Sequence, residues 1–309
     1  MSRLVAHKRV TRVRVADDRV FVAERSDALS VEEPLEIRVG GAPLTITMRT
    51  PGHDVELAAG FLVSEGVITA ASHFRGAIHC GGPGLGAPPS AGSRPNLIIG
   101  SRLADATLGS AADDGNTYNV LDVTLAPGVP LPDTDLSRNF YTTSSCGLCG
   151  KASIEAVHTV SAFDVAADPA VVTIDDLLAL PGRLREQQRM FDQTGGVHAA
   201  ALFDVATGEL LVLREDVGRH NAVDKVIGWG VLHDRLPLSG TVLQVSGRAS
   251  FELAQKAAMA GIPILSAVSA PSSLAVELAA SAGMTLVGFV RDERLNVYAG
   301  AQRVVGATA

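Results

Sequence analysis

The fold is decided by residues 241–261, which read TVLQVSGRASFELAQKAAMAG. The run Thr241 to Val245 is short, continuous and mostly apolar, which favours a buried strand, and a polar turn follows it directly. Helical character then extends from Ala249 to Ala260, where Gly261 ends it. A buried strand that passes through a polar turn into a helix is the unit from which α/β sheets are built.

The same alternation continues on both sides of this stretch. Downstream, the sequence predicts a strand over Pro263 to Val268, a helix over Pro271 to Ala282 and a strand over Met284 to Val290. Upstream, it predicts paired strands over Val197 to Val205 and Glu209 to Leu213, followed by a helix over Arg219 to Leu232. A hairpin followed by right-handed crossovers predicts a mixed sheet with helices on both faces.

A helical segment is also predicted before the paired strands. Thr173 has the position of an N-cap, with Asp175 and Asp176 in the first turn. Pro181 is expected to interrupt this helix, after which the helical pattern resumes as far as Phe191. Together these elements predict an α/β domain over residues 140–309.

The first part of the chain predicts a smaller, β-rich domain over residues 1–139 with one helix. Lys8 to Met48 reads as short strands, and Leu35 to Val39 joins Leu44 to Met48 through the hairpin signal Gly40-Gly41. A helix is expected over Asp54 to Ser64. The boundary between the two domains is placed in the linker-like residues 127–132 or just before residue 140.

Composition limits the possible functions. The chain has 309 residues, 47% of them hydrophobic but only 4% aromatic, so we expect an aliphatic core. A net charge of -7 argues against a nucleic-acid scaffold. Three cysteines do not form a disulfide framework, and neither a signal peptide nor a membrane-spanning run is apparent. We therefore expect a soluble, cytoplasmic protein, and a homodimer because broad aliphatic surfaces combine with a weak net charge.

Two of the three cysteines stand close together in Cys146-Gly147-Leu148-Cys149. Small and hydroxylated residues surround them, which predicts a mobile loop, and the helical pattern that follows predicts a helix starting near Cys149. A helix N-terminus and the neighbouring Lys151 both favour the thiolate form of a cysteine. The spacing therefore favours reactive sulfur chemistry.

Two other interpretations of the cysteine pair stay open. The residues can be ordinary small residues in a tight turn, or half of a structural zinc site. His79 and Cys80 would complete a set of four zinc ligands, but nothing in the sequence brings the two places together.

Unusual polar residues gather where the predicted strands end. In an open α/β sheet the ligand crevice lies beyond the carboxyl ends of the strands. Glycines allow close approach of the backbone, helix N-termini offer free N–H donors, and arginine supplies a bidentate fork. These turns predict a binding site for a phosphorylated ligand, formed by Gly218, Arg219, His220, Ser246, Gly247, Arg248, Ser269 and Ser272, with Arg291, Asp292, Glu293 and Arg294 after the last strand.

Three histidines have two interpretations each. His220 has the place of a proton-transfer group or of an orienting hydrogen-bond partner. His198, inside an apolar run after Gly195-Gly196, is either a core residue or a functional one. His53 before the first helix is a turn or capping residue, or a metal ligand.

Four segments of the chain form a recognisable set: CGLCG at 146–150, FDQTGGVHAA at 191–200, REDVGRHNAVDK at 214–225 and VSGRASFE at 245–252. Together they resemble the FdhD/NarQ family of sulfur carrier proteins required for formate dehydrogenase activity. The similarity covers essentially the whole chain and continues through residues 269–273, 288–289 and 296–298. The segment from Arg214 to Lys225 is the most specific.

The resemblance implies a function and a set of residues. It implies that Cys146 takes sulfur from a cysteine desulfurase as a persulfide, with Cys149 assisting. It implies delivery of this sulfur to the molybdenum bis(molybdopterin guanine dinucleotide) cofactor, a bound substrate, before the cofactor enters formate dehydrogenase. It further implies that the guanine dinucleotide site includes Phe289, Val290 and the four residues that follow.

The resemblance also implies a cytidine-deaminase-like fold for the second domain. The zinc chemistry of deaminases does not carry over, because it needs H-x-E followed by P-C-x-x-C. Here the cysteine pair comes first, and Ala200 stands where the glutamate after His198 would be. No permanently bound metal is expected.

Two rival functions are kept. A dithiol oxidoreductase would use Cys146 and Cys149 as a redox pair, which leaves the phosphate-type turns without a role. A non-catalytic cofactor-binding chaperone would use the turns and leave the cysteines only a structural role.

Overall fold

The computed structural model describes residues 4–80, 118–131 and 161–306. Its largest element is a six-stranded sheet with the order β13-β12-β11-β10-β8-β9. The strands are β8 (His198–Asp204), β9 (Leu210–Asp216), β10 (Thr241–Val245), β11 (Ile264–Ala267), β12 (Thr285–Arg291) and β13 (Arg294–Ala299). β8 is antiparallel to β9 and β10, and β13 is antiparallel to β12, whereas β10, β11 and β12 run parallel. The mixed sheet predicted from the sequence is confirmed.

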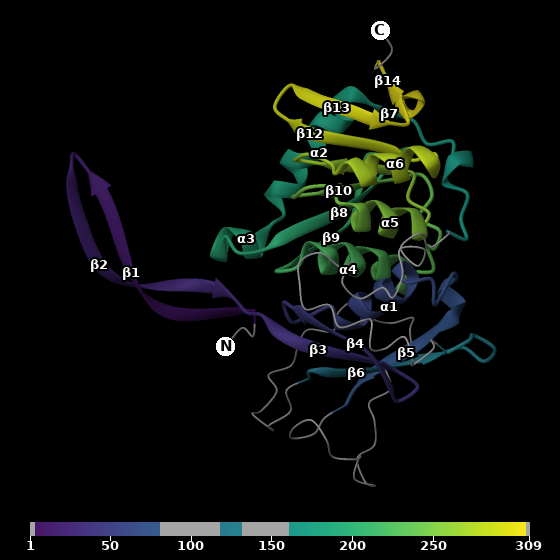
Figure 1. Cartoon of the computed structure of the whole chain (residues 1–309), viewed down its shortest axis with the longest axis horizontal. Coiled ribbons are helices and arrows are strands. Elements are labelled where there is room, and N and C mark those ends of the chain that lie inside the picture. The colour runs from purple at the N-terminus through teal and green to yellow at the C-terminus, as the bar shows by residue number, and fades with distance from the viewer. Residues whose placement is uncertain (1–3, 81–117, 132–160, 307–309) are drawn as a thin grey trace.

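Helices cover both faces of this sheet (Figure 1). The first face carries α4 (Arg219–Leu232), α5 (Phe251–Met259) and α6 (Ser273–Ser281), and the second carries α2 (Ile174–Glu186). The short helix α3 (Arg189–Thr194) follows α2. A further small pair, β7 (Val172–Thr173) and β14 (Val304–Val305), is parallel. The sheet is thus sandwiched between two helical layers, as the α/β class requires.

The N-terminal part forms a second sheet, with the order β4-β3-β6-β5. Its elements are β3 (Glu33–Val39), β4 (Ala42–Arg49), β5 (Phe74–His79) and β6 (Val120–Leu125), with helix α1 (Asp54–Ser64) after β4. Gly40 and Gly41 join β3 to β4 with φ values of 59° and 84°, so the predicted hairpin is confirmed. His53 is the N-cap residue of α1, with φ 56° and no side-chain capping bond.

One hydrophobic cluster unites the two sheets. It contains Leu35 and Leu121 of the small sheet, Leu57 of α1, Val226 of α4 and Leu243 of the large sheet, all at most 1% exposed. Helices α1 and α4 cross in the middle of it (Figure 1). The expected domain boundary near residue 139 lies outside the described residues, but the packing shows a shared core on either side of it.

The first two strands form a long arm that extends from the body (Figure 1). β1 (Val5–Ala16) and β2 (Arg19–Ser30) pair antiparallel along their whole length. The turn residues Asp17 and Asp18 have φ values of 47° and 57°, the conformation of a two-residue hairpin turn. The expectation of short strands here was wrong, because this turn lets 12 residues pair on each side.

Two further details differ from the sequence prediction. Pro181 lies inside α2, which continues to Glu186, so the break comes at Gln187 and Gln188 instead. Thr173 caps this helix as predicted, because its Oγ1 accepts a hydrogen bond from the N–H of Asp176 at 3.1 Å. β13 was not predicted at all. In the parts of the chain that the structure describes, no helix has the length and apolar character needed to cross a membrane.

Candidate functional site

The carboxyl ends of four strands meet at one edge of the large sheet. β9 and β10 are both antiparallel to β8 and therefore parallel to each other, and β11 and β12 run in the same direction. The turns that follow β9, β10, β11 and β12 consequently share this edge, as does the start of β8. We call it the carboxyl edge, and it brings the predicted polar turns together.

Two helices begin at the carboxyl edge without a side-chain cap. Gly218, which has no side chain, is the N-cap of α4, and Ser250, whose side chain makes no capping hydrogen bond, is the N-cap of α5. The first N–H groups of both helices and the positive ends of their dipoles point toward this edge. Such an arrangement suits an anionic ligand.

Gly247 lies above the imidazole ring of His198. A Cβ atom at position 247 would lie 3.6 Å from Nδ1 of His198, which is ordinary van der Waals contact. Ser246 fixes the start of β8, because its Oγ accepts a hydrogen bond from the N–H of Ala199 at 2.9 Å. Arg248 is exposed beside them. The β10 turn therefore combines a structural serine with a glycine and an arginine that a ligand can reach.

His198 is half-buried, and its surroundings disfavour a positive charge. Burial lowers the pKa of His198 below 6.5, and the nearby positive charges of Arg219 and of protonated His220 lower it further, while Asp216 acts in the opposite direction. The neutral ring can donate one hydrogen bond and accept another. His198 is therefore more than a core residue, since it forms part of the carboxyl edge.

His220 is held by the start of α5. Its Nε2 lies 3.5 Å from Oε2 of Glu252 and 3.5 Å from Oγ of Ser250. Burial raises the pKa of Glu252, but hydrogen bonds from His220 and Ser250 outweigh this and keep the pKa below its usual 4.5. These contacts favour the orienting role of His220, because its ring already has partners at the N-terminus of α5.

The remaining predicted residues occupy the far part of the carboxyl edge. Ser269 accepts a hydrogen bond through its carbonyl oxygen from the N–H of Phe289 at 3.2 Å, and Ser272 caps α6 by accepting from Ala275 at 3.2 Å. Phe289 has φ 54° where the pairing of β12 with β13 becomes irregular. The side chain of Val290 is buried in the second hydrophobic cluster, so only its backbone is available.

Residues Arg291, Asp292, Glu293 and Arg294 form the turn between β12 and β13, and all four are exposed. Four strand spacings separate this turn from the one after β9, which corresponds to about 19 Å along the sheet. A small ligand cannot contact both turns. An extended ligand such as a dinucleotide can.

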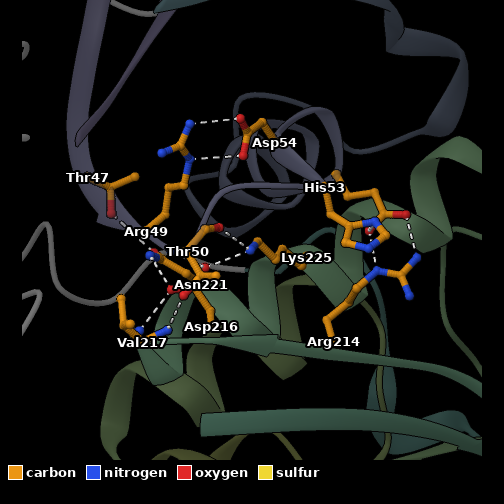
Figure 2. Close-up of polar contacts among 12 residues, drawn as sticks. Thr47, Arg49, Thr50, His53, Asp54, Arg214, Asp216, Val217, Asn221 and Lys225 are labelled. Atoms are coloured by element: carbon orange, nitrogen blue, oxygen red, sulfur yellow. Dashed lines mark hydrogen bonds and ion pairs between the residues drawn. The ribbon is translucent and has the colours of Figure 1, made fainter. Parts of the chain in front are cut away.

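The string from Arg214 to Lys225 has a second role that the sequence did not reveal. Many of its side chains point away from the carboxyl edge and into the contact with the small sheet (Figure 2). Asp216 is fully buried and lies 2.7 Å from Nζ of Lys225, while its carboxylate also accepts hydrogen bonds from the N–H groups of Thr50 at 3.1 Å and Gly218 at 2.8 Å. Lys225 also donates to the carbonyl oxygen of Thr50 at 2.9 Å.

Asn221 extends this network to β4. Its Nδ2 donates to the carbonyl oxygen of Met48 at 2.8 Å and to Asp216 at 3.1 Å, and its Oδ1 accepts from Thr47 at 3.2 Å. On the other side of Thr50, the buried guanidinium of Arg49 pairs with both carboxylate oxygens of Asp54 at 3.0 Å. Every buried charge shown in Figure 2 thus has an opposite partner, as burial requires.

One more ion pair and one hydrogen bond join α1 to the α/β unit. Arg214 forms a bidentate pair with Glu56, at 2.5 and 2.6 Å, and His53 lies 3.2 Å from the same carboxylate (Figure 2). Burial raises the pKa of Glu56, but the hydrogen bonds from Arg214 and His53 hold it below 4.5. Asp224 accepts from Ser64 of α1 at 2.7 Å and from Lys256 of α5 at 2.8 Å. The specific string therefore fixes the packing that supports the carboxyl edge.

The cysteines fall into two groups. Cys146 and Cys149, with their predicted loop and helix, lie outside the described residues, so both assignments stay predictions. Cys80 follows β5, where burial and the neighbouring Asp122 raise the pKa of its thiol. Within residues 4–80, 118–131 and 161–306, no group of three or more His, Cys, Asp or Glu side chains is placed to hold a metal ion.

Comparisons with known proteins agree with the resemblance stated above. The model of the FdhD/NarQ family matches residues 30–305. The chain belongs to the FdhD/NarQ family. A relative from Mycolicibacterium paratuberculosis named "Sulfur carrier protein FdhD" is 57% identical over 91% of this chain and 93% of its own length. A relative of the same name from Streptomyces coelicolor is 54% identical and covers 98% of this chain and 97% of its own length.

The fold is shared with a solved structure. A crystal structure from Desulfotalea psychrophila, of a protein with a proposed formate dehydrogenase accessory role, matches with a TM-score of 0.66. It is 23% identical and covers 97% of this chain and 99% of its own. The two chains therefore share one mixed α/β fold.

Proposed function

We propose that this chain is a sulfur carrier that receives sulfur on Cys146 and passes it to the molybdenum cofactor of formate dehydrogenase. The observation that carries the proposal is the close relationship to proteins named "Sulfur carrier protein FdhD", at 57% and 54% identity over nearly the whole chain. The carboxyl edge supports it, because two uncapped helix N-termini and exposed arginines suit the phosphates of a nucleotide-bearing cofactor.

The first step is an exchange between a thiolate and a persulfide. The Cys146 thiolate attacks the outer sulfur of the persulfide on a cysteine desulfurase, so that one S–S bond forms as the other breaks. The desulfurase cysteine leaves as a thiolate with the electron pair of the broken bond. Cys146 then carries the extra sulfur, and Cys149 assists as its neighbour in the chain.

The second step moves this sulfur to the bound substrate, the molybdenum bis(molybdopterin guanine dinucleotide) cofactor. The persulfide bond breaks, Cys146 leaves as a thiolate, and the metal of the substrate supplies the two electrons that convert the transferred atom to sulfide. The protein contributes position, since a carrier works by bringing two reactants together. The loaded cofactor is then passed to the catalytic subunit of formate dehydrogenase.

The carboxyl edge is the proposed binding surface for the guanine dinucleotide. The N-termini of α4 and α5 would receive phosphate oxygens, with Gly218 and Gly247 allowing the close approach. Arg219, Arg248 and Arg291 supply positive charge along the same edge. A distance of about 19 Å between the β9 and β12 turns suits a ligand with two extended nucleotide arms. We place the reaction in the cytoplasm, because a reducing compartment keeps the acceptor thiol of Cys146 out of disulfides.

The experiment follows the sulfur itself. The purified chain is incubated with a cysteine desulfurase and cysteine, and its proteolytic peptides are weighed. We expect the peptide with Cys146 to gain the mass of one sulfur atom, and we expect the Cys146→Ser variant to gain none. The Cys80→Ser variant is the matched control and should load normally. An unmodified Cys146 peptide, or loading on Cys80, would contradict the proposal.

The same variant separates the proposed carrier from its rivals. If formate dehydrogenase matures normally with Cys146→Ser, the chain is a cofactor-binding chaperone instead. A dithiol oxidoreductase would lose its activity equally with Cys146→Ser and Cys149→Ser, and it would show no gain of sulfur mass.

A further inference from the structure

Thr50, which follows β4, makes hydrogen bonds to the segment that leads from β9 into α4 (Figure 2). Its N–H donates to Oδ2 of Asp216 at 3.1 Å, its Oγ1 accepts from the N–H of Val217 at 3.1 Å, and its carbonyl oxygen accepts from Nζ of Lys225 at 2.9 Å. The residue is only 1% exposed. Its backbone N–H, its hydroxyl and its carbonyl are thus all engaged by the start of α4 and the strand before it.

These contacts fix the backbone at the start of α4. Val217 immediately precedes Gly218, the N-cap of the helix. The N–H of Val217 is held by Thr50, and the N–H of Gly218 is held by Oδ1 of Asp216 at 2.8 Å. The peptide planes on both sides of Val217 therefore have set directions. These planes lead into the first turn of α4, so they determine where its N–H groups point.

The hydroxyl is the part of this arrangement that depends on the identity of residue 50. The N–H and carbonyl contacts use the backbone, which almost any residue offers. The bond to Val217 needs a hydroxyl on Cβ, which only serine and threonine have. This hydroxyl also lies 3.4 Å from Oγ of Ser30, which can take its proton while Oγ1 accepts from Val217. Its orientation is therefore fixed from two sides.

We infer that Thr50 is a positioning residue for the ligand of the carboxyl edge. It acts through Val217, because it directs the first N–H groups of α4 toward the ligand without lying at that edge itself. This role rests on the proposed function, which supplies the guanine dinucleotide as the ligand. Donors of a binding site must be held to within about 0.5 Å by the residues behind them. The β4 end of the small sheet thus contributes to a site whose contacting residues all belong to the α/β unit.

Ser64 provides a matched control in the same interface. It is buried, and its Oγ donates to Oδ1 of Asp224 at 2.7 Å, so it also joins the N-terminal part of the chain to α4. Asp224, however, lies in the second turn of the helix and is held independently by Lys256 at 2.8 Å. Loss of the Ser64 hydroxyl should therefore weaken the packing without moving the start of α4.

The first test measures the binding of guanosine diphosphate to the full chain by calorimetry. In Thr50→Val we expect the dissociation constant to rise at least about tenfold, because the N–H of Val217 loses its acceptor. Thr50→Ser keeps the hydroxyl and should bind within about twofold of the wild type. Ser64→Ala should also bind within about twofold, although urea denaturation should show it to be destabilised like Thr50→Val. A purely structural role of Thr50 would give the two destabilised variants the same affinity.

The second test examines the start of α4 in the absence of ligand. In Thr50→Val we expect amide hydrogen exchange at residues 217–221 to become at least about threefold faster, whereas Ser64→Ala should leave it unchanged. Loading of sulfur on Cys146 should be equal in the wild type and all three variants, since that step does not use the carboxyl edge.

The outcomes separate this role from the proposed function. A wild-type chain that gains no sulfur mass on Cys146 would contradict the proposed function, and the comparison of nucleotide affinities would still decide the role of Thr50. That role is overturned if the wild type does not bind guanosine diphosphate or if Thr50→Val binds it as tightly as the wild type. It is also overturned if Ser64→Ala loses as much affinity as Thr50→Val, or if Thr50→Ser does not restore it.

Discussion

Gly60 of α1 and Gly228 of α4 let the two helices touch backbone to backbone. A Cβ atom at Gly60 would lie 1.8 Å from the carbonyl oxygen of Asp224, and one at Gly228 would lie 1.8 Å from the carbonyl oxygen of Glu56. Each glycine therefore sits against the helix of the other. The crossing joins the small sheet to the α/β unit in one core, and the ion pairs of Glu56 with Arg214 and of Asp224 with Lys256 involve residues next to it.

Gly60→Ala should destabilise the protein severely. The added methyl group meets backbone atoms that cannot move aside, so we expect a loss of about 3 kcal/mol or more in the free energy of unfolding. Gly182→Ala in α2 is the control, because nothing lies within 4 Å of its Cβ position. It should stabilise the protein by roughly 0.5–1 kcal/mol through helix propensity. Urea denaturation measures both, and equal effects would contradict the close crossing.

The buried pair of Asp216 and Lys225 should be unequal in its response to substitution. Asp216→Asn places an amide among four donors, from Lys225, Thr50, Gly218 and Asn221. We expect it to cost about 3–5 kcal/mol. Lys225→Met should cost less, because three N–H donors still serve the carboxylate of Asp216. A larger loss of stability for Lys225→Met than for Asp216→Asn in chemical denaturation would contradict this expectation. It would show that the three N–H donors do not stabilise the carboxylate of Asp216 without Lys225.

The helix crossing at Gly60 and Gly228 and the buried pair of Asp216 and Lys225 were not predicted from the sequence. The alternation of strands and helices after residue 197 was predictable, because buried strands are followed by polar turns and the last two helices stop at Gly261 and Gly283. The structural role of Asp216 and Lys225 was not predictable from the sequence. Both residues contact Thr50, which lies more than 160 residues away in the chain. The string from 214 to 225 looks the same in sequence whether its side chains bind a ligand or another part of the chain.

The arm and the last hairpin were missed for a related reason. Asp17-Asp18 and Asp292-Glu293 form turns in which aspartate adopts positive φ, a weaker signal than the Gly40-Gly41 pair that was recognised. Pro181 was expected to end a helix, but packing of Leu177, Leu180 and Leu184 in the second cluster carries α2 through it. Tertiary contacts outweigh local propensity at such places.

Gly247→Ala should separate binding from folding. The new methyl group would lie 3.6 Å from Nδ1 of His198, so the fold has room for it, and we expect a change of less than about 0.5 kcal/mol in the free energy of unfolding. The same methyl group would occupy the space through which a phosphate approaches the β10 turn. We expect the affinity for guanosine diphosphate, measured by calorimetry, to fall at least about tenfold. Unchanged affinity would show that Gly247 is not part of the binding site.

Stability should depend on pH through His198. Its pKa is lower in the folded chain than its ordinary value of 6.5, mainly through burial, so the unfolded chain binds more protons between the two values. This contribution to stability is present above pH 6.5 and is lost as pH falls through the folded pKa. In His198→Asn we expect the urea midpoint to vary less between about pH 5.5 and 7.5 than in the wild type. Equal slopes in the two proteins would contradict the environment described for His198.

The central claim is that the carboxyl edge receives the guanine dinucleotide of the sulfur acceptor, and hydrogen exchange with guanosine diphosphate tests it most directly. We expect the ligand to slow amide exchange at residues 218–221 and 247–253, where α4 and α5 begin, and at 289–294 after β12. The small sheet, residues 33–49, should exchange at the same rate with and without the ligand. Protection confined to the small sheet, or no protection at the starts of α4 and α5, would contradict the account.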